Sequence, residues 1–316
     1  MEKNRKRILI GSCGGLTGVY LEKQLHRFPE IEICGFDANQ DSIGKFFCDS
    51  FFVVPLVSSD CFISDLIDLL NREKIDFYVP THSKEIIKIS ENEQLIRNRT
   101  NTRFIVTPYE TYLALDDKFF ANKNLQKIEI PVPHIYDSNE KPSKFPLLKK
   151  PKIGSGSNGL YKINNIEEFN AACCDEKSFV MDYLSGTEYT VDCLFDENGN
   201  LLGYNQRRRD KCIGGAVSIS SNDNSFNILP FLKKIFEKWV IKGCVNFQYI
   251  LVNGIPYFID CNLRYASGGL PLSVESGVDV PYALKKMCFN ESFCMDEFKS
   301  DFANRTMYRY FEEKFV

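Results

Sequence analysis

A change in the pattern of apolar and polar residues near residue 115 constrains the fold more than any other feature of these 316 residues. Before it, short apolar runs alternate with segments of helical period, beginning RILIG, GVYLEKQLHRF and IEICGFD. Repeating strand–helix units predict a parallel sheet covered by helices on both faces. After it come mostly β-rich runs, interrupted by the amphipathic segment ILPFLKKIFEKWV. A chain of this length holds about two domains, and we place them at residues 1–115 and 116–316.

The charge and hydropathy pattern excludes several classes of protein. The net charge is −3, and the densest basic cluster consists only of the three arginines at 207–209. Such a short cluster does not indicate nucleic-acid binding, and no apolar run is long enough to cross a bilayer. The N-terminal run ILI is typical of a buried first strand, not of a signal peptide. We therefore expect a cytoplasmic globular protein.

Cysteine is frequent, with twelve residues, but no two are spaced as CxxC. A zinc site would need paired thiolates a few residues apart. Most of these cysteines stand in apolar segments such as IEICGF and KGCVNF. The pattern indicates small buried side chains in a reducing compartment.

The first glycine-rich stretch, GSCGGLTG, follows the first apolar run and precedes a helical segment. The next apolar run closes with Asp37, as in the dinucleotide-binding fold of NAD-dependent oxidoreductases. The spacing Gly11-x-x-Gly14-Gly15-x-x-Gly18 nevertheless misses the strict G-x-G-x-x-G pattern. Two interpretations stay open. Gly14 and Gly15 either form a plain turn or shape the substrate side of a cleft at the carboxyl edge of the sheet.

A second glycine-rich stretch, FPLLKKPKIGSGSNG, opens from a strand and is followed by another strand-like run, GLYKI. It is therefore neither a Walker loop nor a dinucleotide loop, because both lead into a helix. A β-hairpin whose small residues at 154–159 cover phosphate groups fits this pattern better. Alternation along the strand places Leu148 and Lys150 on one face and Lys149 on the other.

The stretch NFQYILVNGIPYFIDCNLR predicts a hairpin that carries metal ligands. Asp260 and Asn262 share a strand face, and Gln248 lies on the preceding strand. A two-residue Asn-Gly turn would set Gln248 opposite Ile259, whereas an odd-length loop at 252–254 would bring it onto the face of Asp260. Three oxygen-bearing side chains without His or Cys suit Mg²⁺.

These pieces, in this order, resemble the ATP-grasp superfamily. The likeness extends over residues 1–285 and includes DDKFFANKNLQKIEIPVP and FVMDYLSGTEYTVD, beside the second glycine stretch and the hairpin. It is similar to D-alanine–D-alanine ligase and to single-copy relatives of the carbamoyl-phosphate synthase large subunit. The resemblance implies an α/β protein with an N-terminal Rossmann-like parallel-sheet domain. An ATP-grasp fold of two α+β subdomains follows, with a mobile lid in residues 116–184.

The resemblance also implies the roles of individual residues. ATP phosphates contact Lys118, Lys150 and the glycine loop, and adenine contacts the carbonyl of Met181 and the N–H of Leu184, although the family often has Glu at 181. The ribose hydroxyls donate to Glu188, and Arg264 contacts the transferring phosphate and the substrate. The loop residues implied are Gly154, Ser155, Gly156 and Ser157, and the ligands of Mg²⁺, or of Mn²⁺ in its place, are Gln248, Asp260 and Asn262.

The reaction implied is activation of a carboxylate by ATP to an acylphosphate, which an amine then displaces to give ADP and phosphate. Small-molecule carboxylate and amine substrates would be the partners, and relatives often form homodimers. We expect Arg209 to contribute to catalysis from the strand LLGYNQRRR. Candidates for substrate contacts are Gly14, Gly15, Arg207, Ser267, Gly268 and Gly269.

Three other interpretations are open at this point. One is a carbamoyl-phosphate-synthase-like phosphotransfer enzyme, although only one ATP-grasp unit is present. Another is a non-catalytic ATP-binding protein, which the complete set of charged residues disfavours. The third is the NAD-dependent oxidoreductase, supported only by residues 11–37.

Overall fold

The computed structural model describes residues 5–154, 158–172 and 175–316. Its N-terminal part is a five-stranded parallel sheet of order β3-β2-β1-β4-β5. The strands are β1 Lys6–Ile10, β2 Ile31–Asp37, β3 Ser50–Val53, β4 Phe77–Val79 and β5 Arg103–Phe104. The helices are α1 Leu16–Leu25, the 3₁₀ helix η1 Ile43–Phe46, α2 Phe62–Arg72, α3 Ser83–Glu91 and α4 Glu93–Arg99. The predicted strand–helix alternation is confirmed.

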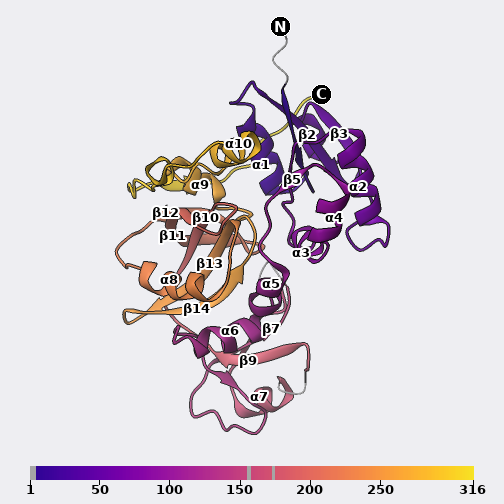
Figure 1. Ribbon diagram of the computed structural model, residues 1–316. Coiled ribbons are helices and arrows are strands. Elements are labelled where there is room, and N and C mark those ends of the chain that lie inside the picture. The colour runs from indigo at the N-terminus through magenta and orange to yellow at the C-terminus, as the bar shows by residue number, and fades with distance from the viewer. Residues whose placement is uncertain (1–4, 155–157, 173–174) are drawn as a thin grey trace.

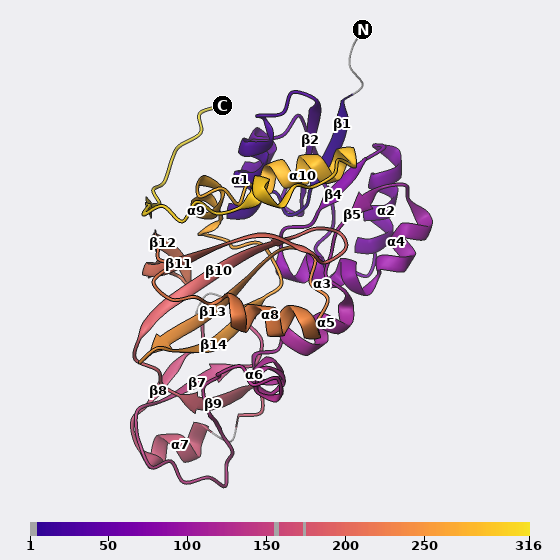
Figure 2. The same ribbon diagram turned by 60° about the vertical axis from the view of Figure 1, so that its left-hand side comes forward.

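A helix from the end of the chain completes the packing of the parallel sheet. Helix α10, Val280–Phe289, lies beside α1, as both ribbon views show (Figures 1 and 2). Its buried Ala283 and Met287 belong to the same apolar cluster as Ile8 and Leu21. The N-terminal sheet therefore shares its core with residues beyond 280, and the predicted boundary near residue 115 stays a prediction.

The central sheet has six antiparallel strands in the order β14-β13-β10-β11-β12-β15. They are β10 Thr187–Phe195, β11 Leu201–Ile213, β12 Ala216–Asn222, β13 Gly243–Val252, β14 Ile255–Asn262 and β15 Thr306–Tyr308. Helix α8, Leu229–Lys238, packs on this sheet through Phe236, whose ring contacts those of Phe195 and Phe247. Helix α9, Leu270–Glu275, contacts β11 and β12, and the 3₁₀ helix η2, Met295–Phe298, contacts β11.

A smaller antiparallel sheet, of order β6-β9-β7-β8, forms the lower end of the molecule in Figure 1. Its strands are β6 Ile135–Tyr136, β7 Leu147–Pro151, β8 Tyr161–Ile163 and β9 Ser178–Asp182. Helix α7, Ile166–Ala172, packs against it, and α5, Tyr109–Leu115, and α6, Lys118–Lys127, lead into it. The parallel sheet followed by two antiparallel sheets confirms the predicted α/β fold class.

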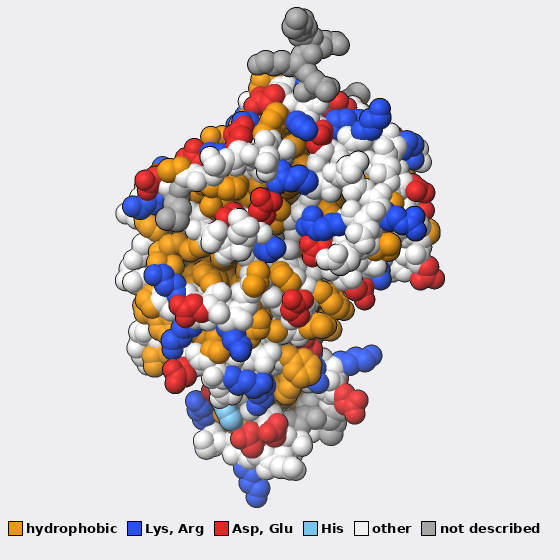
Figure 3. Space-filling model, in the orientation of Figure 1, with side chains coloured by type: hydrophobic (Ala, Val, Ile, Leu, Met, Phe, Trp, Pro, Cys, Tyr) orange, Lys and Arg blue, Asp and Glu red, His pale blue; other side chains and the backbone are white. Residues whose placement is uncertain are grey.

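The surface agrees with the moderate net charge. Figure 3 shows acidic and basic side chains interspersed over the face in view, with hydrophobic side chains gathered near mid-height. Within the described ranges, no helix has the length and apolar character needed to cross a membrane.

The cysteines follow the predicted pattern only in part. Six are buried, including Cys193 and Cys261, and all ten for which a state is described are free thiols. Cys61, Cys212 and Cys294 are exposed, because each lies at a turn, a strand end or a loop rather than in a packed strand. The pair at 173–174 lies outside the described residues.

Candidate functional site

A large cavity of about 1050 Å³ lies where the three sheets meet. Its walls come from the carboxyl edge of the parallel sheet, from the face of β10, β11, β13 and β14, and from β7 and β9 of the smaller sheet. Its size suits a small-molecule ligand. We call the part formed by the two antiparallel sheets the hairpin side, and the part formed by residues 12–84 the parallel-sheet side.

The register of the β13–β14 hairpin decides which side chains face the cavity. Val252 pairs with Ile255, so the turn has only the two residues Asn253 and Gly254, both with positive φ (50° and 80°). Of the two loop lengths considered, the two-residue turn forms and the odd-length loop does not. The register shifts further along instead, where Gln248 pairs with Asp260 and the next residue pairs with Phe258.

This bulge leaves Ile259 without an opposite partner and restores Gln248 and Asp260 to one face. Both residues line the cavity, together with Asn262. A bulge within the strands thus brings the three candidate metal ligands to the same face of the hairpin. An unchanged two-residue register would have sent Asp260 to the opposite face.

Lys150 is fixed by the bulge. Its Nζ donates to the Ile259 carbonyl at 2.7 Å and lies 3.7 Å from Asp260 Oδ2. The residue is 7% exposed, and burial lowers the pKa of its ammonium while the Asp260 carboxylate opposes that shift. Its neighbour Lys149 points the other way, to Asp175 at 2.9 Å, as the strand alternation predicts.

A second lysine approaches the same carboxylate from the start of α6. Asp117 caps this helix, since its Oδ1 accepts from the N–H groups of Phe119 and Phe120. The first helical residue, Lys118, donates from Nζ to the Gly154 carbonyl at 2.7 Å and lies 3.4 Å from Asp260 Oδ1. Asp260 is therefore flanked by two cations.

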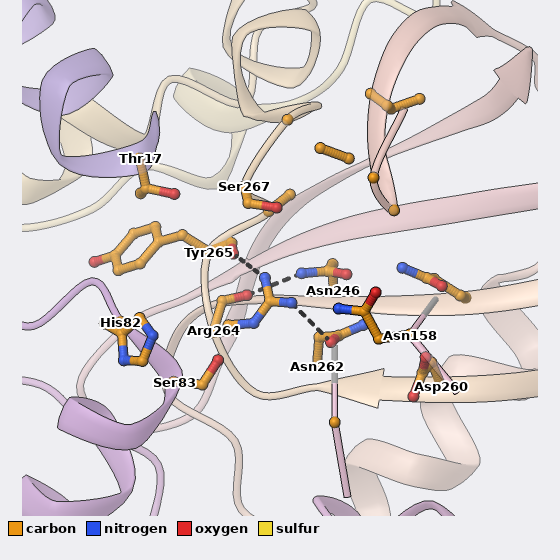
Figure 4. Close-up of a pocket in the computed structure, with 18 of the residues that line it drawn as sticks. Thr17, His82, Ser83, Asn158, Asn246, Asp260, Asn262, Arg264, Tyr265 and Ser267 are labelled. Atoms are coloured by element: carbon orange, nitrogen blue, oxygen red, sulfur yellow. Dashed lines mark hydrogen bonds between the residues drawn. The ribbon is translucent and has the colours of Figure 1, made fainter. Parts of the chain in front are cut away.

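Arg264 continues this row of charge beyond the end of β14 (Figure 4). Its Nη2 donates to Asn262 Oδ1 at 3.2 Å, and its Nη1 donates to the Tyr265 carbonyl at 3.0 Å. The backbone carbonyl of Arg264 in turn accepts from Asn246 Nδ2 at 2.9 Å. Burial lowers the pKa of the guanidinium, with Asp260 acting in the opposite direction. The group is held in place before any ligand arrives.

The oxygen set suits a hard divalent cation. The Asp260 carboxylate and the amide of Gln248 face each other across the hairpin, and Asn262 lies two residues further along the same strand. The Gln248 side chain makes no hydrogen bond to any other described residue. Groups of three or more His, Cys, Asp or Glu that could hold a metal do not occur in the described chain, so a metal here would need the two amides and phosphate oxygens as further ligands.

The candidate adenine-binding segment follows β9 on the hairpin side. Residues 181–184 line the cavity together with Leu148 and Ile250. Met181 sits within the strand, paired with Ile135 and Leu148 on its two sides. Leu184 lies beyond the strand, and its N–H makes no hydrogen bond within the described chain. The N–H is thus available to a ligand, and both adenine contacts stay predictions.

The three arginines of β11 have different surroundings. Arg209 Nε lies 2.7 Å from Glu188 Oε1, and its Nη2 donates to the Gly215 carbonyl at 3.0 Å. The Arg208 side chain lies on the face of β11 opposite to those of Arg207 and Arg209, and it pairs with Asp210. The predicted ribose acceptor and the predicted catalytic arginine therefore contact each other.

Arg207 is 1% exposed and forms a buried pair with Asp192, at 2.8 Å from Nε and 3.3 Å from Nη2. Its Nη1 is buried without a hydrogen-bond partner, and the residue lines the cavity. A Cβ on Gly269 would lie 1.9 Å from its Cζ, so a larger residue there would displace the guanidinium from its pairing with Asp192. The other substrate candidates on this wall, Ser267 and Gly268, also line the cavity.

The first glycine stretch forms a tight turn. The Gly14 N–H donates to Asp37 Oδ2 at 3.0 Å, and a Cβ on Gly14 would lie 2.1 Å from Ser42 Oγ. Asp37 is thus occupied by the protein's own groups, which disfavours the dinucleotide interpretation. Gly15 caps α1 and lines the cavity, whereas Gly14 does not. Ser155, Gly156 and Ser157 lie outside the described residues, while Gly154 and Asn158 line the cavity.

Several lining residues were not singled out in the sequence. They come from the starts of α1 and α3, from loops and from strand β13, which only the fold brings together. For those next to the parallel sheet, the one available signal was a position shortly after a strand. Figure 4 shows them around Arg264: Thr17, His82, Ser83, Asn158, Asn246 and Tyr265.

Comparisons with known proteins agree with this architecture. A family model described as "ATP-grasp in the biosynthetic pathway with Ter operon" matches residues 175–309. The D-alanine–D-alanine ligase of Fusobacterium nucleatum is 28% identical over 164 residues, which cover 46% of this chain and 55% of that protein. The carbamoyl phosphate synthase large chain of Clostridium beijerinckii is 30% identical over 315 residues, covering 89% and 28%. The matches thus span about half, or less, of these relatives.

Solved structures share the fold at low identity. Biotin carboxylase from Campylobacter jejuni has a TM-score of 0.70 at 17% identity, covering 93% of this chain and 73% of that chain. N5-carboxyaminoimidazole synthetase from Staphylococcus aureus, complexed with ADP, has 0.71 at 13%, covering 93% and 80%. An L-amino acid ligase from Bacillus licheniformis has 0.69 at 15%, covering 97% and 79%. With three sheets arranged around one charged cavity, this chain belongs to the ATP-grasp superfamily.

Proposed function

We propose that the protein is an ATP-dependent carboxylate–amine ligase that acts through an acylphosphate and releases ADP and phosphate. The observation that carries this proposal is the convergence of Lys118, Lys150 and Arg264 around Asp260 on one wall of the cavity. Relatives named as a D-alanine–D-alanine ligase and an L-amino acid ligase support the same class of reaction.

The chain's own residues would act mainly by positioning and by neutralising charge. In this proposal, Lys118 and Lys150 turn from Gly154, Ile259 and Asp260 toward phosphate oxygens, at little cost because each keeps an anionic partner nearby. Arg264 holds the substrate carboxylate against the terminal phosphate. Figure 4 shows Arg264 between Asn262 on the hairpin side and Thr17 and His82 on the parallel-sheet side, where a substrate would enter.

Magnesium fits the donor set of Gln248, Asp260 and Asn262, and Mn²⁺ takes the same ligands. When bound, the ion neutralises charge on phosphate oxygens. The described residues need no side-chain nucleophile, because the carboxylate attacks phosphorus and the amine later attacks the acyl carbon. Water must be excluded meanwhile, and in this proposal the β7–β8 hairpin, whose Gly154 carbonyl accepts from Lys118, covers the phosphates.

A second candidate is phosphate transfer of the carbamoyl-phosphate-synthase type. It is favoured by the carbamoyl phosphate synthase large chain of Clostridium beijerinckii, whose match extends over 89% of this chain. A non-catalytic ATP-binding protein would not need a buried lysine held beside a carboxylate at some cost of desolvation. We further propose a cytoplasmic location and small-molecule substrates, with homodimer formation as in many relatives.

An array of carboxylates and amines with ATP and Mg²⁺ tests the proposal through release of ADP and phosphate. We expect phosphate release only when both an acid and an amine are present. Release with bicarbonate and ammonia alone would favour the carbamoyl-phosphate alternative. Magnesium-dependent ATP binding without turnover on any pair would contradict the ligase assignment.

A further inference from the structure

The parallel-sheet side of the cavity differs in chemistry from the hairpin side. It lies at the carboxyl ends of β1, β2, β3 and β4, next to the point where the strand order reverses between β1 and β4. Open α/β sheets bind ligands at this point. Its apolar lining residues are Leu16, Phe36, Pro55, Leu56, Val57 and Phe62.

Two leucines on this side are turned toward solvent. Leu16, the first residue of α1, is 51% exposed, and Leu56, in the loop after β3, is 67% exposed. Phe36 and Phe62 line the same cavity and are buried, at 3% and 1% exposure. A single exposed leucine needs no explanation, but several apolar side chains gathered on the wall of one cavity indicate a binding surface.

The charged groups on this side do not favour a cationic ligand. Asp37 already accepts from the N–H groups of Gly14 and Asn39, both at 3.0 Å, and from Ser42 Oγ at 3.2 Å. It is the only carboxylate among the described lining residues of this side. Lys84 is exposed beside His82 and has no acidic partner in the described chain. An ammonium group entering here would therefore lack a free counter-ion.

Arg264 stands between the two sides. In Figure 4 its guanidinium faces Asn262 in the direction of Asp260, while Tyr265, Thr17 and His82 lie in the opposite direction. A carboxylate held at Arg264 with its reacting oxygen toward the phosphates must extend the rest of its molecule away from the hairpin side. The surface that it then reaches is the one that carries Leu16 and Leu56.

We infer that the parallel-sheet side is a specificity subsite for the apolar side chain of the carboxylic acid substrate, of branched or aromatic type. This inference rests on the proposed ligase function, because that function fixes the position of the carboxylate. The subsite selects by burying apolar surface of the acid against the two exposed leucines. It gives no compensating contact to a basic side chain.

Hydroxylamine as the acceptor tests the subsite without knowledge of the natural amine, since it traps any acylphosphate as a hydroxamate. With ATP, Mg²⁺ and a panel of amino acids, we expect kcat/KM to rise roughly 10–200-fold from alanine to leucine or phenylalanine. Lysine should fall below alanine. Equal or better turnover of lysine would overturn the inference.

Single-residue variants test whether Leu16 and Leu56 cause the expected preference for apolar acids. Leu56→Asp and Leu16→Asp should each raise KM for leucine about tenfold or more while leaving KM for ATP unchanged, because both side chains lie away from the hairpin side. Leu113→Asp is the matched control, since Leu113 is 62% exposed on α5 and does not line the cavity. An unchanged leucine-to-alanine preference in both cavity variants would overturn the inference.

Calorimetric titration separates failure of the subsite from failure of the ligase assignment. Leucine, alanine and lysine are titrated into the protein with ADP and Mg²⁺. Preferential binding of leucine that Leu56→Asp abolishes, without hydroxamate formation, supports the subsite and contradicts only the ligase. Binding of none of the apolar acids, or equal binding of lysine, overturns the subsite even where ATP is turned over.

Discussion

The two sides of the cavity hold their charges in opposite ways. On the hairpin side, Lys118, Lys150 and Arg264 face the cavity and are fixed by carbonyls and by Asp260 or Asn262. On the parallel-sheet side, the buried carboxylate of Glu85 lies behind the wall. It accepts from Ser12 Oγ at 2.7 Å and from the His82 N–H at 3.3 Å, and thereby holds the two loops that line the cavity. Charged groups face the cavity on one side and support its wall from behind on the other.

This difference follows from what each side binds in our proposal. Polyphosphate recognition needs cations in place beforehand, because reorganising charge during the reaction is costly. An apolar side chain needs only surface of the right shape, which loops provide when they are anchored from behind. Four changes, ordered from the largest expected effect to the smallest, test the contrast.

Replacement of Asp260 by alanine should have the largest effect. The change removes the only carboxylate among the three proposed metal ligands and leaves two cations facing each other, so we expect turnover to fall by at least about 10³-fold. Release of ADP is the measurement, over a range of Mg²⁺ concentrations. Asp175→Ala, which removes the partner of Lys149 on the outer face, is the control. A folded Asp260→Ala protein with unchanged turnover would exclude Asp260 as a metal ligand.

Replacement of Lys150 by alanine should lower turnover by roughly 10²–10³-fold, as for loss of one fixed group that stabilises developing charge. The fold should persist, because the lysine packs at the cavity wall rather than in an apolar cluster. Lys149→Ala is a close control, being the adjacent residue of the same strand with its side chain on the opposite face. Equal losses in the two variants would show that strand stability, and not the facing charge, causes the effect.

The contact between Glu188 and Arg209 predicts coupled, smaller effects. We expect Glu188→Gln and Arg209→Ala each to raise KM for ATP about tenfold, corresponding to the ~1.5 kcal/mol of one hydrogen bond to a charged group. The double variant should lose little more than either single variant, because both changes break the same contact. Steady-state kinetics of the four proteins measure this coupling. Additive losses would mean that the two side chains act on the ligand independently.

Glu85 should affect stability and its pH dependence rather than ATP binding. Burial, partly offset by its hydrogen bonds, raises the pKa of this carboxyl from its ordinary value of 4.5 to about 6. Since the folded state holds this proton more tightly than the unfolded state, protonated Glu85 stabilises the fold. The stabilisation is fully present below pH 4.5 and is lost as the pH rises through 6. The loss amounts to about 2 kcal/mol for a shift of this size.

Urea unfolding of the wild-type and Glu85→Gln proteins between pH 4 and 7.5 isolates this term. The free energy of unfolding of the wild type, minus that of the variant, should decrease with rising pH by about that amount. Subtracting the variant removes the contribution of all other groups that titrate similarly in both proteins. A difference that stays flat over this range would mean that Glu85 has an ordinary pKa.

The sequence predicted the hairpin side far better than the parallel-sheet side. Lys150 and Asp260 stand in strands whose alternation assigns them a face, and the order of four motifs is specific to a superfamily. His82 and Leu56 lie in loops after parallel strands, and Thr17 lies in the first turn of the helix after such a loop. Loops have no periodicity, and the position of all three residues depends on how distant strands pair. The buried Arg207–Asp192 pair could not be predicted from the sequence either, because its burial depends on packing between β10, β11 and α9.

In the β13–β14 hairpin, Gln248 and Asp260 share a face because of a bulge, and not because of an odd-length loop. For Gln248 and Asp260 to share a face, one extra residue had to lie somewhere between them. The sequence of the turn did not reveal whether that residue lay in the loop or in a strand. The Asn-Gly turn forms as its residues prefer, and the strand absorbs the extra residue at Ile259, where the ammonium of Lys150 satisfies the displaced carbonyl.

The bulge at Ile259 also sets a rule for length variation in this segment. With the two-residue turn kept, deleting one residue from either strand between 248 and 260, or adding one, would rotate Asp260 out of the cavity and leave Lys150 without its carbonyl. Two such changes together would restore both. Related chains should therefore vary here by even numbers of residues or not at all, whereas the loop between β14 and α9 is free of this parity. Single-residue insertions placed along the hairpin would display that parity as an alternation between active and inactive proteins.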